Sequence, residues 1–147
     1  GNWWIDDVQV TQTQVPGSCE TAAVAGPPPI PDGASVAGSP LLLSKSGEDV
    51  ELVWDATRCP PEAINVYYGT VGDYAGFTGG YCALPPTGTA ALSLPDDAWV
   101  LVVASDGVDT DGSWSRDHTG TELSYSGAGT VCPSMTAHDP GGTCELP

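Results

Sequence analysis

The run Trp99-Val100-Leu101-Val102-Val103-Ala104 is the most apolar stretch of the sequence, and it decides the fold class. A short continuous apolar run rich in β-branched residues is typical of a strand that is buried on both faces. Pro95-Asp96-Asp97 precedes the run and separates it from the segment before. We therefore expect 99–104 to be a central strand of a β-sheet.

Shorter apolar segments surround this run, and turn residues separate them. The expected strands are 41–43, 49–54, 63–69, 90–94, 99–104 and 121–125. Of these, 121–125 should close the sheet, whereas the Gly-rich stretch 70–81 should be an irregular edge or loop. The chain has 19 Gly and 14 Pro among 147 residues and no sustained helical period, which argues against long helices. Short strands with regular turn signals predict an all-β sandwich.

The first ten residues have the pattern of a strand whose sheet lies elsewhere. Trp, Ile and Val alternate there with Asn, Asp and Gln, which is the period of a half-buried strand. A single strand cannot satisfy its own backbone groups, so it has to join a sheet in its own chain or in a neighbouring one. Trp3 and Trp4 point to opposite faces, which fits a strand held in a sheet better than a sugar-stacking platform. The residues expected to make this contact are Trp3, Trp4, Ile5, Val8 and Val10.

These segments predict four regions along the chain. They are an N-terminal strand at 1–15, a Pro/Gly-rich spacer at 16–40, a sandwich at 41–132 and a turn-rich tail at 133–147. The spacer contains Pro27-Pro28-Pro29-Ile30-Pro31, which should form a stiff polyproline II segment. We expect this segment to hold the first strand away from the sandwich.

The charge of the chain excludes several classes of partner. Lys45, Arg58 and Arg116 are the only cationic residues against 19 carboxylates, which gives a formal net charge of −16. This charge repels phosphate backbones and anionic membrane surfaces, so we expect no nucleic-acid partner. No apolar run is long enough for membrane insertion. An acidic surface suits a cation-rich medium or serves solubility alone, and the sequence leaves both readings open.

The cysteines indicate an oxidising, extracellular setting. The chain has five, Cys19, Cys59, Cys82, Cys132 and Cys144, and none has the Cys-x-x-Cys spacing of common zinc and redox motifs. Cys59 and Cys82 flank the third expected strand and its loop, which makes them a plausible disulfide pair. Spacing alone does not fix the connectivity. Because the number is odd, one thiol is left free or pairs with another chain.

Three segments resemble strands of a known family. Val50-x-Leu52-x-Trp54, Asn65-Val66-Tyr67-Tyr68-Gly69 and 99–104 resemble a fibronectin type III-like sandwich, in which Trp54 stands at the core tryptophan of the second strand. The stretch 111–120 is similar to an Asp-Gly-Ser-x-Gly segment in versions at the C-termini of large bacterial secreted proteins, although Ser115 stands where Gly is common. Over residues 41–132 the resemblance implies a fibronectin type III or immunoglobulin-like fold. The opening strand is similar to the last strand of a jelly-roll-like module.

Candidate residues for chemistry are sparse. No nucleophile elbow or His-Glu-x-x-His motif occurs, and nothing fixes His118 or His138 in a triad, so we do not expect an enzyme. Asp109 and Asp111 stand at alternate positions beside glycine in an acidic turn, which makes them candidate Ca²⁺ ligands. The favoured alternative is a solvated acidic loop. No other cofactor is indicated.

These features predict a non-enzymatic extracellular structural protein. Its N-terminal strand would add to the sheet of a neighbouring subunit, so the partner is another copy of the chain. Head-to-tail contacts of this kind are heterologous and propagate into a filament unless a ring closes. The alternative is a C-terminal module of a larger secreted hydrolase that binds a surface or a glycan.

Overall fold

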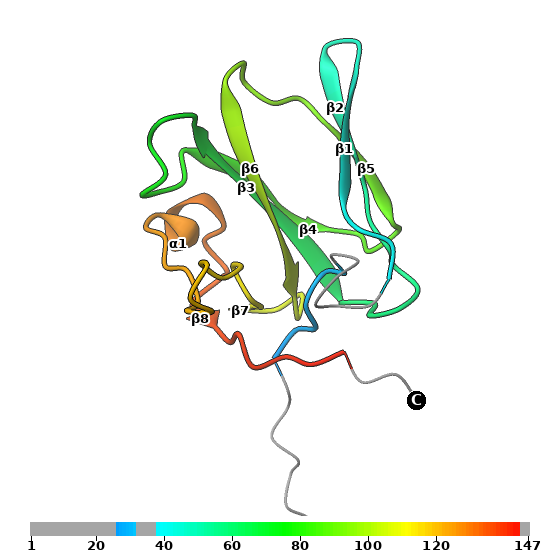
Figure 1. The fold of residues 1–147 in the computed structure, drawn as a ribbon, viewed down its shortest axis with the longest axis vertical. Coiled ribbons are helices and arrows are strands. Elements are labelled where there is room, and N and C mark those ends of the chain that lie inside the picture. The colour runs from blue at the N-terminus through cyan, green and yellow to red at the C-terminus, as the bar shows by residue number, and fades with distance from the viewer. Residues whose placement is uncertain (1–25, 32–37, 145–147) are drawn as a thin grey trace, which may run out of the picture.

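The strands form two sheets that pack face to face (Figure 1). The computed structural model describes residues 26–31 and 38–144. The small sheet has the order β1-β2-β5, with β1 at Leu42–Ser46, β2 at Asp49–Val53 and β5 at Thr89–Leu92. The large sheet has the order β4-β3-β6-β7-β8, with β4 at Gly79–Leu84, β3 at Ala63–Thr70, β6 at Ala98–Ser105, β7 at Thr110–Asp111 and β8 at Ala137–His138. The predicted all-β sandwich is confirmed.

Alternate side chains of the central strands fill the space between the two sheets. The buried residues of this inter-sheet core are Leu52, Trp54, Ile64, Val66, Leu92 and Val102. Ile64 and Val66 come from one face of β3, as the alternation in 63–69 predicts, and Tyr68 on the same face is half-buried. Trp54, expected in the core, is 4% exposed.

A second core lies on the opposite face of the large sheet, so the molecule has three layers. Its buried residues are Tyr67, Phe77, Val103, Ala128, Cys132 and Met135. The segment that follows β7, drawn yellow to orange in Figure 1, covers this face and includes the single helical turn α1 at Ala128–Val131. Central strands buried on both faces explain why 99–104 reads as a continuous apolar run.

The prediction of a strand at 121–125 is wrong. In the described residues, this stretch makes only an isolated bridge between Arg116 and Glu122, next to a second bridge at Ser126. The aromatic rings explain the difference: Tyr125 packs against Phe77 and Trp99, with ring centroids 5.0 and 5.5 Å apart. The segment therefore lies on the face of the large sheet instead of pairing with its edge.

Three other boundaries differ from expectation. The Gly-rich stretch 70–81 includes the start of β4. The expected tail at 133–147 is part of the domain, because Met135 is in the second core and β8 joins the large sheet. The described end of the spacer also packs on the sandwich, since Pro27 and Pro31 are buried and Ile30 contacts the inter-sheet core. Residues 1–25, with the expected N-terminal strand, lie outside the described residues.

The disulfide pair expected from spacing is also wrong. Cys59 bonds to Cys144, and Cys82 bonds to Cys132. Sequence spacing places Cys59 and Cys82 at the two ends of one hairpin, whereas the fold brings the C-terminal segment back to each of them. Cys19 lies outside the described residues.

We predict that peptide mapping without reduction will recover the Cys59–Cys144 and Cys82–Cys132 peptides. Each bond closes a long loop, with sequence separations of 85 and 50 residues. Loops of this size correspond to about 4 kcal/mol of stabilisation in the chain-entropy model. The C82S/C132S double variant should therefore unfold at a clearly lower urea concentration than the parent chain. Recovery of a Cys59–Cys82 peptide would contradict the fold described here.

Candidate functional site

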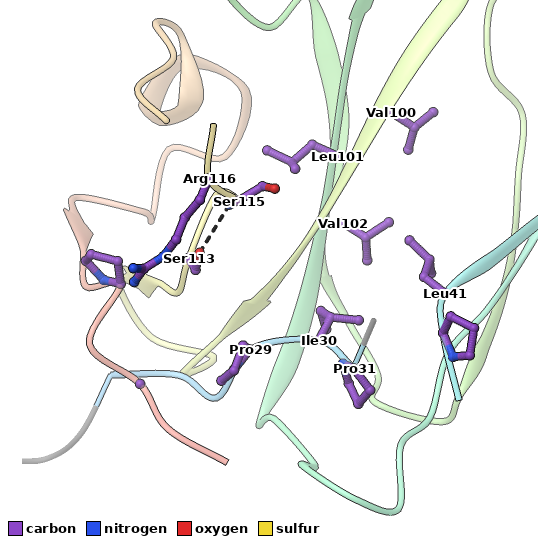
Figure 2. Close-up of a pocket in the computed structure, with 13 residues that line it drawn as sticks. Pro29, Ile30, Pro31, Leu41, Val100, Leu101, Val102, Ser113, Ser115 and Arg116 are labelled. Carbon is purple, nitrogen blue, oxygen red and sulfur yellow. Dashed lines mark hydrogen bonds between the residues drawn. The ribbon is translucent and has the colours of Figure 1, made fainter. Parts of the chain in front are cut away.

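A groove of about 730 Å³ lies beside β6, between the small sheet and the segment that follows β7 (Figure 2). Three consecutive residues of β6 line it: Val100, Leu101 and Val102. Consecutive side chains of a strand point to opposite faces of the sheet. One groove can therefore touch all three only where it runs along the edge of the strand.

The backbone of β6 has no strand partner along this groove within the described residues. β3 pairs with one edge of β6 over its whole length. On the other edge β7 pairs at Ser105 alone, and the amide of Gly112 donates to the carbonyl of Ala104 at 2.8 Å. Backbone groups of alternate residues point to the same edge of a strand. The N–H and C=O groups of Val102 and Val100 therefore point the same way as those of Ala104, into the groove.

The two walls of the groove differ in chemistry (Figure 2). The wall on the inter-sheet side is apolar and is formed by Ile30, Pro31, Leu41, Val100 and Val102. The opposite wall is formed by Leu101, Ser113, Ser115 and Arg116. Arg116 is the only charged residue among those described that line the groove. A segment in the groove would thus contact apolar side chains on one face. On its other face it would contact a leucine, two serines and an arginine.

The other sheet edges carry features that oppose the addition of a strand. β1 is exposed at every position and contains Lys45, whereas β5 and β8 are only four and two residues long. β4 has a register shift opposite Ile64 and Val66, and its Ala83 has a left-handed backbone with φ of 54°. Charged residues, short strands and bulges are the usual protection of a sheet edge. β6 has none of these along the groove, so its edge is the one best suited to pairing.

A buried carboxylate holds the chain away from that edge. Asp111 is fully buried, and its oxygens accept hydrogen bonds from Asn65 Nδ2 at 2.7 Å, Tyr67 Oη at 2.5 Å and Trp114 Nε1 at 3.4 Å. Asn65 Oδ1 in turn accepts a hydrogen bond from the amide of Ala83 at 2.7 Å. Burial and the neighbouring Asp111 raise the pKa of Tyr67, which keeps its hydroxyl protonated as a donor. These bonds fix the chain after β7 on the face of β3.

A second carboxylate organises the polar wall of the groove. Glu122 accepts hydrogen bonds from the Ser113 hydroxyl at 3.0 Å and the Trp114 amide at 2.5 Å. His138 Nε2 lies 3.2 Å from the same carboxylate, and Arg116 Nε lies 3.5 Å from it. Glu122 therefore holds the Nε end of the Arg116 guanidinium in place, while the Arg116 side chain is 57% exposed.

The turn before Arg116 depends on a left-handed residue. Ser115 has φ of 82°, a conformation that glycine adopts at little cost and other residues rarely adopt. The turn places Ser115 and Arg116 in the groove wall.

Asp55 fixes the opposite wall, where the chain enters the small sheet. Its carboxylate accepts hydrogen bonds from the Thr57 hydroxyl at 2.7 Å and from the amides of Ser39, Thr57 and Arg58. These bonds, with that of the Thr57 hydroxyl the strongest cause, lower the pKa of Asp55 to about 2. The carboxylate therefore stays charged, and anchors the residue before Pro40 and Leu41, at any pH above about 3.

The structure does not bring the candidate Ca²⁺ ligands together. Asp109 is exposed, whereas Asp111 is buried and bonded to protein donors. Among the described residues, no group of three or more His, Cys, Asp or Glu side chains is arranged to hold a metal ion. His118 is exposed, and the ring of His138 stacks on Trp114 at 4.2 Å. The strand residues Trp3, Trp4, Ile5, Val8 and Val10 lie outside the described part of the chain.

Comparison with family models, curated proteins and solved structures found no match to this chain. In the described part of the chain, no helix has the length and apolar character needed to cross a membrane.

Sequence reasoning identified β6 but missed the groove beside it. The missing information is that 121–125 covers a sheet face, so that it does not pair with the edge of β6. A signal was present in the aromatic residues Trp114 and Tyr125, which need a buried face to pack on. Because 121–125 also alternates like a strand, its pattern alone predicts a strand of the sheet.

We predict that Asp111→Ala lowers the free energy of unfolding by about 3 kcal/mol, because it leaves buried donors of Asn65 and Tyr67 without an acceptor. The matched control is Asp109→Ala in the same turn, which should change stability by less than about 0.5 kcal/mol because Asp109 is exposed. Urea denaturation with and without Ca²⁺ measures both. Equal effects of the two substitutions, or stabilisation by Ca²⁺ that Asp109→Ala removes, would contradict this assignment.

Proposed function

We propose that the protein is a non-enzymatic extracellular structural protein that assembles by strand addition. The N-terminal strand of one copy, with Trp3, Trp4, Ile5, Val8 and Val10, would occupy the groove beside β6 of the next copy. The observation that carries this proposal is the edge of β6 that has no strand partner among the described residues and that lines an apolar groove. In sandwiches of the immunoglobulin type, the seventh strand lies beside the sixth. Here the pairing of β7 with β6 is limited to Ser105 and Asp111.

The length of the open edge of β6 matches the length of the expected N-terminal strand. Residues 98–103 of β6, which pair with β3 alone in the described part of the chain, would extend about 20 Å at the usual rise of a strand. The alternating segment Trp3–Val10 is long enough to pair along that whole length. Pairing would satisfy the backbone groups of Val100 and Val102, and the groove would take side chains from both faces of the added strand.

Burial of the added strand supplies the driving force. A tryptophan side chain buries about 150–250 Å². At about 25 cal/mol per Å², two such residues contribute roughly 8–12 kcal/mol before the costs of association. Those costs are about 4–15 kcal/mol, so the backbone hydrogen bonds and the aliphatic residues of the strand are needed for stable docking.

The position of the spacer favours a neighbouring copy as the donor. Pro29, Ile30 and Pro31 line the groove, so the Pro-rich part of the spacer lies against the sandwich. Polyproline segments resist tight reversal. A strand attached through such a segment can extend away from its own domain to another molecule. Repetition of this contact would give a head-to-tail filament.

Two disulfides in the described chain support an extracellular location. The formal net charge of −16 would keep subunits apart at low salt, so we expect assembly to become faster as ionic strength screens this repulsion.

The proposal predicts that the full chain forms filaments that disappear when residues 1–15 are deleted. Negative-stain electron microscopy and sedimentation velocity measure both samples. Leu101→Lys should also abolish assembly because it places a charge in the groove. The matched control is Val71→Lys, at a residue that is 52% exposed and does not line the groove, and it should assemble normally.

Circular dichroism separates loss of assembly from loss of fold, since the deletion and Leu101→Lys should both retain the β spectrum. A synthetic peptide of residues 1–15 should bind the truncated chain, whereas a scrambled peptide should not. Filaments from the truncated chain, or a monodisperse full chain at all salt concentrations, would overturn the proposal. In the second case, the glycan-binding alternative becomes the one to test on polysaccharide.

A further inference from the structure

Arg116 is a cationic residue in the lining of the groove, in a chain that is otherwise strongly acidic. It is one of three cationic residues in a chain with 19 carboxylates, and it is the only charged residue among the described ones that line the groove. Figure 2 shows it on the same side of β6 as Leu101, Ser113 and Ser115. A cation on the groove wall of a strongly acidic protein would favour an occupant that carries a negative charge beside it.

The surroundings of Arg116 leave donors for such a charge. Glu122 contacts the Nε atom of Arg116 at 3.5 Å. Glu122 also accepts hydrogen bonds from Ser113 and Trp114, so this contact fixes the base of the guanidinium group. The guanidinium carries five N–H donors in a planar fork. The Arg116 side chain is 57% exposed, so a docked segment can contact it.

The strand assigned to the groove contains a matching charge. Asp6 and Asp7 stand in the middle of its alternating pattern. Consecutive side chains of a strand point to opposite sides, so only one of the two can face the wall that holds Arg116. The face with Trp4, Val8 and Val10 is the more apolar one and fits the apolar wall. Asp7 is on the other face.

We propose that Arg116 recognises the docked strand through an ion pair with Asp7 of the neighbouring copy, which sets the face and the register of docking. This inference rests on the proposed strand addition. Asp6 would then share the apolar face with Trp4 and Val8. A carboxylate there has no cationic partner among the described groove residues, so it weakens docking.

The test uses full-length variants and measures the critical concentration for assembly by light scattering. Asp7→Asn and Arg116→Gln should each raise it about fivefold, the upper range for a partly exposed ion pair. Asp6→Asn is the matched control and should leave it unchanged or lower it. In the Arg116→Gln background, Asp7→Asn should have no further effect, because the two residues form one interaction. At 1 M salt, the differences should shrink.

The outcomes separate this inference from the proposed function. Filaments from the full chain with no loss in Asp7→Asn, or with an undiminished loss in the Arg116→Gln background, overturn the ion pair and leave strand addition intact. A loss in Asp6→Asn instead of Asp7→Asn overturns the assigned face. No filaments from the unmodified chain would overturn strand addition, and the ion pair with it.

Discussion

The buried carboxylate of Asp111 is the interaction on which the rest of the structure depends. It binds Asn65 and Tyr67 on the face of β3 and accepts a hydrogen bond from Trp114. A buried charge is tolerated only where donors satisfy it, so this contact fixes the position of the chain that leaves β7. From that point, the chain can cover the face of the large sheet or pair with the edge of β6, but not both. Here it covers the face.

The position of this segment on the sheet face accounts for the second core and for the open edge of β6. Covering the face buries the aromatic rings of Trp114 and Tyr125 against Phe77 and builds the second core. It also leaves Val100 and Val102 with backbone groups that point into a groove. Unpaired edges invite strand addition, and the other edges of this protein are protected by charge, shortness or a bulge. An unprotected edge beside apolar side chains is the observation on which the proposed strand addition rests.

Local patterns predicted much of the fold. The alternation of 49–54 and 63–69, and the apolar run 99–104, give β2, β3 and β6 because the side-chain period of a strand is visible in sequence. The errors involve long-range contacts. Cys59 and Cys82 look like partners because they are near in sequence, but the C-terminal segment returns to bond with both. Likewise, 121–125 alternates like a strand, and only the fold shows that Tyr125 packs on a sheet face. The groove beside β6 exists because 121–125 lies on the sheet face. It could therefore not be predicted without knowing where that segment packs.

Hydrogen exchange at the amides of Val100 and Val102 tests the central claim most directly, because these amides change partner only if a strand pairs with β6. We expect both amides to exchange rapidly in the chain lacking residues 1–15 and to be protected in the assembled full chain. The amides of β6 that face β3, including Val103, serve as the internal reference and should be protected in both samples. Equal exchange of Val100 and Val102 in the two samples would show that no strand is added at this edge and would contradict the account.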